Sequence, residues 1–206
     1  TNANVKLLKD GRLMAVSSFW NRDYYSRSGV DKNDEFPTDS EGKAANEQHG
    51  IRIKFSSDNG RNWTSSQVVY NGPNWECHIM EPTAGHIQIY FAESRPRISD
   101  SHSGTSMIES KDNGVTWTPT LGNKAFRVMR KFWVDASNRG GVQKKFTYQM
   151  PVGVILNGSS QMAFALECVE GSIGKLDHKV AVVHSSADGK WNDLQGDETT
   201  PAANRQ

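Results

Sequence analysis

Two glutamates in this sequence each follow a short apolar run, and a pair of this kind could hydrolyse a glycosidic bond. Glu93 comes directly after residues 90–92, Tyr-Phe-Ala, and Glu167 comes directly after residues 164–166, Phe-Ala-Leu. Such hydrolysis needs one carboxyl group that protonates the leaving oxygen and another that attacks the anomeric carbon or activates water. Apolar surroundings raise the pKa of a carboxyl group, so one of the pair could stay protonated near neutral pH. Either glutamate alone is also compatible with a solvated strand end.

Other residues beside apolar runs are candidates for substrate binding. Trp75 and Glu76 begin a strand-like run, and Arg22 and Tyr24 directly follow another one. Arg95 opens a polar, proline-containing loop. Loops that leave a rigid sheet often carry binding residues, so we expect these side chains near the substrate, with a plain solvated loop as the alternative.

A repeated turn motif indicates which elements hold these residues. The motif S-x-D-x-G-x-x-W occurs at residues 56–63 and again at 110–117, and a shortened relative occurs at 186–191. Its Asn-Gly step suits the positive φ of a tight hairpin turn, and its Asp can accept backbone N–H bonds. Its Trp would anchor the following strand in the gap between neighbouring sheets. The residues expected in this structural role are Asp58, Gly60, Trp63, Asp112, Gly114, Trp117, Asp188 and Trp191.

Strand-like runs follow one another along the whole chain and predict an all-β fold. About 12 such runs suffice for three to four blades of a β-propeller, whose blades take about 40 to 50 residues each. We expect one domain over residues 1–206, incomplete at one or both ends, with a long polar segment at 21–49. The main expected strands cover residues 5–8, 13–19, 50–55, 67–70, 75–80, 87–93, 126–134, 150–156, 161–167 and 179–185.

Composition argues against two classes of partner. The chain of 206 residues has a formal net charge of +1, which gives no electrostatic bias toward nucleic acid or anionic membranes. No run reaches the roughly 18 apolar residues of a membrane helix. The first residues lack the features of a signal peptide, and we expect the sequence to begin within a domain. Neither nucleic acid nor a membrane is an expected partner.

Cysteine and histidine spacing gives no metal site. Cys77 and Cys168 are too few for a disulfide scaffold, and we favour buried free thiols over a disulfide between adjacent blades. The six histidines show no spacing typical of metal ligands. The proposed hydrolysis needs no metal or organic cofactor.

The motifs resemble those of a known superfamily. The octets match the Asp-box, or bacterial neuraminidase repeat, of sialidase-like β-propellers, where such boxes lie on outer hairpins away from the substrate. The resemblance implies a six-bladed propeller of which this chain holds part of the blades. The order of further motifs resembles the exo-arabinanases of glycoside hydrolase family 93, and it comprises Trp75-Glu76, residues 90–93, the box at 110–117, residues 150–152 and residues 165–167.

The resemblance implies specific roles. Glu93 and Glu167 match the two catalytic glutamates of family 93, and Trp75 and Glu76 match a substrate-side motif. Since that family retains anomeric configuration, one glutamate would be the acid/base, here assigned to Glu93, and the other the nucleophile, here Glu167, although the opposite assignment stays open. This sequence departs from the family pattern at two positions: Cys77 stands where the family has Pro, and the Leu before Glu167 stands where the family has Tyr. The implied protein is a secreted, extracellular or periplasmic exo-glycosidase acting on an oligo- or polysaccharide.

An exo-α-sialidase is one alternative. Sialidases bind the carboxylate of their substrate through three arginines, because guanidinium groups pair with carboxylates in a bidentate way, and they use a tyrosine nucleophile. The candidates here are Arg22, Arg95, Arg97, Arg139 and Tyr148, but the Arg-Ile-Pro signature of that family is missing.

A propeller that binds carbohydrate or protein without catalysis is the other alternative, since one fold hosts many functions. Replacement of either catalytic glutamate by Gln separates these cases. An enzyme would lose turnover and keep binding, whereas a binding module has no turnover to lose.

Overall fold

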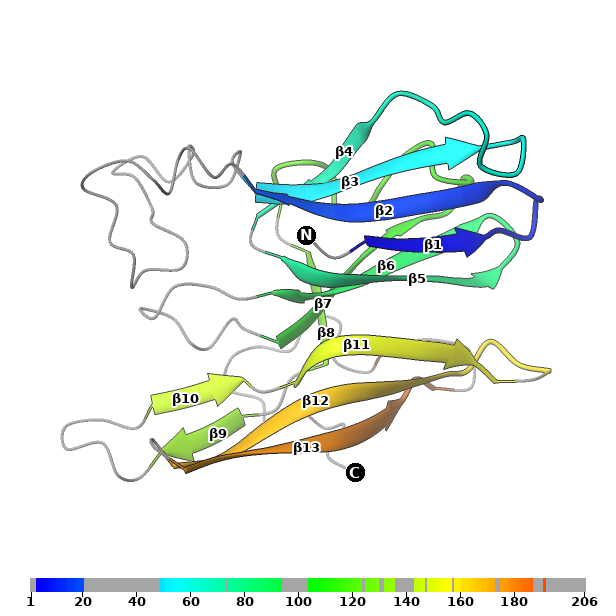
Figure 1. Cartoon of the computed structure of the whole chain (residues 1–206). Helices are drawn as coiled ribbons and strands as arrows, with labels where there is room; N and C mark the ends of the chain where they lie inside the picture. The colour runs from blue at the N-terminus through cyan, green and yellow to red at the C-terminus, as the bar shows by residue number, and fades with distance from the viewer. Residues whose placement is uncertain are drawn as a thin grey trace, which may run out of the picture.

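The chain folds into antiparallel β-strands (Figure 1). The computed structural model describes residues 3–20, 49–72, 74–93, 104–123, 125–129, 132–135, 143–146, 148–156, 158–172, 175–186 and 191. No helix occurs among these residues, and so none of them lies in a helix that could cross a membrane. The predicted all-β class is confirmed.

Three sheets and one hairpin make up the described structure. Sheet I contains β1 (Ala3–Leu7), β2 (Leu13–Trp20), β3 (His49–Ser56) and β4 (Gln67–Asn71). Sheet II contains β5 (Trp75–Thr83), β6 (His86–Glu93), β7 (Gly104–Ser110) and β8 (Phe126–Met129). Sheet III contains β11 (Tyr148–Ile155), β12 (Met162–Ser172) and β13 (Lys175–His184). The hairpin pairs β9 (Phe132–Asp135) with β10 (Gln143–Phe146).

The three sheets are stacked in chain order (Figure 1). Within each sheet, consecutive strands are neighbours and run antiparallel. The first strands also lie together, because β5 contacts both β1 and β11. Sheets built as meanders, packed face to face with their first strands adjacent, are the blades of a β-propeller. The predicted propeller architecture, with part of a ring in this chain, therefore agrees with the structure.

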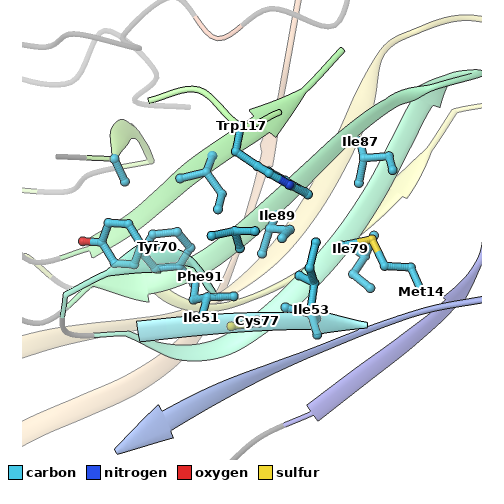
Figure 2. Close-up of a cluster of buried hydrophobic side chains, with 14 of the residues drawn as sticks. Met14, Ile51, Ile53, Tyr70, Cys77, Ile79, Ile87, Ile89, Phe91 and Trp117 are labelled. Carbon is cyan, nitrogen blue, oxygen red and sulfur yellow. The ribbon is translucent and has the colours of Figure 1, made fainter. Parts of the chain in front are cut away.

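Strand β6 is buried on both faces and contributes side chains to both apolar cores. Ile87, Ile89 and Phe91 face sheet I and pack in one apolar core (Figure 2). Tyr90 points the other way and packs on Phe164 of sheet III, with ring centroids 4.5 Å apart. Because successive side chains of a strand point to opposite faces, one strand contributes to two cores.

The two full octets form turns with the same backbone. Asn59 and Gly60 have φ of 59° and 85°, and Asn113 and Gly114 have φ of 60° and 86°. These left-handed conformations are accessible mainly to Gly and Asn. The Asn-Gly step therefore plays the part expected from the sequence.

The aspartates stabilise both turns in the same way. The Asn62 N–H donates to Asp58 Oδ1 at 2.8 Å, and the Thr116 N–H donates to Asp112 Oδ1 at 2.8 Å. The side chains of Asn62 and Thr116 donate to the other carboxylate oxygen of the same aspartate. Each carboxylate thus closes one turn between the third and fourth strands of its sheet.

The tryptophans of the motif differ in burial. Trp117 is 7% exposed in the core between sheets I and II, and Trp191 is 4% exposed in the core between sheets II and III. Trp63 is 36% exposed, so the expected packing between sheets does not apply to it. The reason is positional: Trp117 and Trp191 each pack on the preceding sheet, whereas no described sheet precedes sheet I.

One expected strand is two strands. The sequence predicts one continuous strand over residues 126–134, but β8 pairs with β7 in sheet II while β9 pairs with β10. The apolar pattern continues through both segments, yet each pairs with a different strand.

The two cysteines, Cys77 and Cys168, are buried free thiols, as the sequence favours.

Candidate functional site

The first strands of sheets II and III share an unusual backbone feature. Register shifts occur between Trp75 and His78 in β5 and between Gln149 and Val152 in β11. Within these bulges, Glu76 has a φ of 47° and Met150 a φ of 54°. A positive φ is uncommon for residues other than glycine, costs on the order of 1–3 kcal/mol, and clusters at functional sites.

A histidine bridges the two strands just beyond the bulges. Nε2 of His78 lies 3.1 Å from both the amide nitrogen and the carbonyl oxygen of Gly153 on β11, and the tautomer of the ring decides whether Nε2 accepts from the N–H or donates to the carbonyl. Burial is the main cause of the lowered pKa of His78 and favours its neutral form. The bridge holds β5 beside β11, so the bulges at Glu76 and Met150 belong to neighbouring strands.

Glu76 is electrostatically coupled to Glu167. Burial is the main cause of its raised pKa, and the negative charge of Glu167 is the second cause. Two carboxylates that repel each other do not both ionise readily, so one of them tends to keep its proton. The raised pKa of Glu76 favours its protonated form.

Glu167 lies within β12, on the face that points away from sheet II. Its neighbours Leu166 and Cys168 are buried in the core between sheets II and III, so alternation turns Glu167 outward. Its Oε1 lies 2.7 Å from Nδ1 of His178 on β13. The expected position at a strand end is wrong, because pairing with β13 extends β12 to Ser172.

Glu93 ends β6, as expected, in a different environment. It is 2% exposed, accepts a hydrogen bond from the Tyr70 hydroxyl at 3.2 Å on Oε1, and accepts one from Ser106 Oγ at 2.6 Å on Oε2. Tyr70 belongs to sheet I, so this carboxylate points toward that sheet. A hydroxyl partner on each oxygen fixes its orientation.

The two glutamates do not occupy equivalent positions, contrary to the expectation from the apolar runs. Trp75 pairs with Ala92, and Gln149, at the same place beside its bulge, pairs with Glu167. Ala92 is therefore the counterpart of Glu167. A shift of one residue along a strand reverses the face, so the sequence pattern alone could not show it.

The remaining candidates divide into three groups. Trp75 is half-buried next to Glu76. Tyr148, considered for the sialidase alternative, is 7% exposed in the core between sheets II and III. The others lie outside the described residues, namely Arg22, Tyr24, Arg95, Arg97, Arg139 and Asp188.

Three side chains that contact the glutamates escaped the sequence analysis: Tyr70, Ser106 and His178. Ser106 and His178 lie on strands paired with those of Glu93 and Glu167. Strand pairing was the signal that could have found these two, since side chains on one face of neighbouring strands meet. Among the residues that the structure describes, no cluster of three or more His, Cys, Asp or Glu could hold a metal ion.

Comparison with known proteins gives weak similarities. No family model and no curated protein matches the sequence. A Hadza microbial sialidase matches 92% of this chain with 14% identity and a TM-score of 0.48, over 32% of its own length. A family 117 glycoside hydrolase of the marine bacterium Zobellia galactanivorans matches 88% with 13% identity and a TM-score of 0.45, over 51% of its length. The chain thus spans from a third to a half of these proteins.

Proposed function

We propose that this chain is a glycoside hydrolase of the retaining, exo-acting type. The observation that carries the proposal is the raised pKa of Glu76, which is caused first by burial and second by the negative charge of Glu167. Hydrolysis of a glycosidic bond requires a carboxyl group that can donate a proton and a second carboxyl group beside it. The strained backbone at Glu76 adds support, since such strain is retained where function needs a fixed orientation.

In the proposed first step, Glu167 acts as the nucleophile. Its ionised carboxylate attacks the anomeric carbon, while the protonated carboxyl group of Glu76 donates its proton to the leaving oxygen. His178, 2.7 Å away through Nδ1, orients the carboxylate of Glu167. In the second step, Glu76 takes a proton from water, and the resulting hydroxide displaces Glu167 from the sugar, which restores both groups.

Glu93 is the competing partner for Glu167, since the resemblance to the exo-arabinanases assigns it a catalytic role. Its 2% exposure and its bonds from Tyr70 and Ser106 hold this carboxyl group in one orientation against sheet I. In the arrangement that the geometry supports best, Glu93 positions the end of β6, and Glu76 donates the proton.

The substrate proposed from the resemblance is an arabinan-like oligo- or polysaccharide, and Trp75, which is half-buried, is proposed to lie on the substrate side of the site. The proposed location is extracellular or periplasmic, where such polymers occur. The Asp-boxes at residues 56–63 and 110–117 keep a structural role in this proposal.

The experiment compares Glu76→Gln, Glu93→Gln and Glu167→Gln with the unchanged chain on arabinan and on an activated aryl arabinoside. We expect Glu167→Gln to lower kcat on both substrates by roughly 10²–10⁴-fold. Glu76→Gln should lower kcat strongly on arabinan and much less on the aryl substrate, whose leaving group needs little protonation. Glu93→Gln should show no such difference between the substrates.

The pH profile of kcat/KM gives an independent reading. Because Glu76 must be protonated and its pKa is raised, the activity should fall on the alkaline side through a group that Glu76→Gln removes. If Glu93→Gln, rather than Glu76→Gln, lowers kcat much more on arabinan than on the aryl substrate, then Glu93 is the proton donor. If the unchanged chain binds sugar but shows no turnover, the protein is a carbohydrate-binding propeller and the glycoside hydrolase proposal is wrong.

A further inference from the structure

The side chain of His78 contacts the main chain of the neighbouring sheet. Strand β11 pairs only with β12 among the described strands, and it also contacts β5 of sheet II. Nε2 of His78 on β5 lies 3.1 Å from both the amide nitrogen and the carbonyl oxygen of Gly153 on β11. One hydrogen bond forms in either neutral tautomer, since one tautomer accepts from the N–H and the other donates to the carbonyl. The contact therefore joins the first strands of sheets II and III.

Packing around Gly153 fixes the ring of His78 as well. Gly153 pairs with Phe164 of β12, and a Cβ at position 153 would lie 2.7 Å from the Phe164 ring. The absence of a side chain at Gly153 thus lets β11 lie close against this ring. The Phe164 ring also packs edge-on against His78, with ring centroids 6.1 Å apart and an interplanar angle of 81°. The imidazole is held by an aromatic neighbour in addition to its hydrogen bond.

The segment that carries Glu76 is anchored on its other side by Cys77. The Sγ of Cys77 lies 3.5 Å from Oγ of Ser18 on β2 and donates to Oδ1 of Asn74 at 3.8 Å. Cys77 faces sheet I and His78 faces sheet III, because successive side chains of a strand point to opposite faces. Glu76, whose φ is 47°, directly precedes both anchors. Its uncommon backbone conformation is therefore held between contacts to the two neighbouring sheets.

Glu167 is connected to the same strand, β11, from the side of sheet III. Gln149 of β11 pairs with Glu167 of β12, and Gly153 lies further along β11. The separation between the carboxyl groups of Glu76 and Glu167 thus depends on how closely β5 approaches β11. The contact between His78 and Gly153 is a direct link between these two strands.

We propose that His78 is a positioning residue for the hydrolysis: its contact with Gly153 fixes the spacing of β5 and β11 and thereby holds the carboxyl group of Glu76 beside that of Glu167. This inference rests on the proposed function and adds the residue that sets the geometry of its two carboxyl groups. Proton donation requires the acid to stay within reach of the leaving oxygen, and a misplacement of about 1 Å can cost roughly 10²-fold in rate. His78 acts through Glu76 and does not itself transfer a proton.

The ionisation of Glu76 reports this spacing. Burial and, second, the negative charge of Glu167 raise the pKa of Glu76, and both causes weaken when β5 moves away from β11 and water enters. Two other charged groups among the described residues lie around the contact. They are Lys6 of β1, whose charge adds to burial in lowering the pKa of His78, and His178 of β13, beside Glu167. Substitution of His78 alters neither of them.

The test compares His78→Phe and His78→Gln with the unchanged full chain. Because burial favours the neutral imidazole, neither substitution removes a charge. Phe keeps a planar ring but cannot bond to Gly153, whereas the Gln amide can donate or accept in the place of Nε2. A carboxyl ¹³C NMR titration, with the signal assigned through Glu76→Gln, gives the acid dissociation constant of Glu76. We expect His78→Phe to raise this constant by roughly 3–10-fold and His78→Gln to restore most of the difference.

A matched control and the kinetics complete the test. His86→Phe removes another partly buried histidine of sheet II, which lies 2.7 Å from Glu109, and should leave the titration of Glu76 unchanged. In His78→Phe, the alkaline limb of kcat/KM on arabinan should move to lower pH by the same factor as the titration. Its kcat on arabinan should fall by roughly 10–10²-fold, with a much smaller loss on the activated aryl arabinoside.

The titration decides the proposal without any need for turnover. An unchanged titration of Glu76 in folded His78→Phe would overturn it, and so would equal changes in His78→Phe and His78→Gln, since the hydrogen bond would then not be the cause. A role in stability alone would lower the free energy of urea unfolding and leave the titration where it is. If circular dichroism shows that His78→Phe does not fold, His78→Asn, with its shorter amide, takes its place. The expected titration without hydrolysis of either substrate would refute the glycosidase proposal, while the positioning of Glu76 by His78 would stand.

Discussion

The two full Asp-box turns have the same sequence motif and the same internal hydrogen bonds, but they lie in different surroundings. Both hold an Asn-Gly pair at positive φ and an aspartate that accepts the N–H four residues later. Trp117 at the end of the second box is 7% exposed, whereas Trp63 at the end of the first is 36% exposed. The motif therefore specifies the turn, and the presence of a preceding sheet decides whether its tryptophan stabilises the fold.

The largest expected difference is between the two tryptophans. Trp117→Ala should lower the free energy of unfolding by about 3–5 kcal/mol, because it empties a space in the core between sheets I and II. Trp63→Ala should cost about 1–2 kcal/mol, since its ring already contacts water. Urea unfolding of each variant measures both losses. Equal losses would show that the turn itself needs the ring.

A smaller difference is expected at the box glycines. Gly60 and Gly114 have φ of 85° and 86°, so alanine at either position carries the cost of the left-handed backbone, about 1–2 kcal/mol. A Cβ on Gly114 would also lie 2.5 Å from Cζ of Phe55, whereas a Cβ on Gly60 would lie 3.5 Å from the Leu13 side chain. Gly114→Ala should therefore cost about 1–3 kcal/mol more than Gly60→Ala in the same unfolding experiment. If the two variants are equally stable, the ring of Phe55 moves aside freely.

The smallest effect concerns acid. Hydrogen bonds from Thr116 lower the pKa of Asp112 from 3.8 to about 2, and bonds from Asn62 lower that of Asp58. A carboxyl group whose pKa is lowered by folding stabilises the fold above the unfolded value, and this contribution is lost as the pH falls through the folded value. Melting temperatures between about pH 4 and pH 2 should therefore fall less steeply for Asp112→Asn and for Asp58→Asn than for the unchanged chain. Unaltered slopes would show that these turns open before the carboxylates are protonated.

Local patterns predicted most of the fold. The strand-like run at residues 50–55 and the Asn-Gly step of the repeated turn motif predicted elements that the structure contains, because both signals depend on neighbours in the chain. The division of residues 126–134 between β8 and β9 depends on which distant strand supplies hydrogen bonds, and an apolar pattern carries no such information.

The candidate site was less predictable for the same reason. Glu93 and Glu167 follow similar apolar runs, yet Glu167 is the counterpart of Ala92, and the two carboxylates point to different neighbours. The coupling of Glu76 to Glu167 joins residues far apart in the sequence, through a contact between β5 and β11. The bulges at Glu76 and Met150 need a positive φ, and neither Glu nor Met is a residue type that indicates this conformation in a sequence.

The position of β6 between two cores has a consequence for hydrogen exchange. Ile89 and Phe91 contribute to the core with sheet I, while Tyr90 contributes to the core with sheet III. A fluctuation that separates either pair of sheets leaves β6 hydrogen-bonded between β5 and β7, so its amides exchange with solvent only when the whole assembly of sheets opens. This strand, which ends at Glu93, should therefore be the slowest to exchange in the described part of the chain.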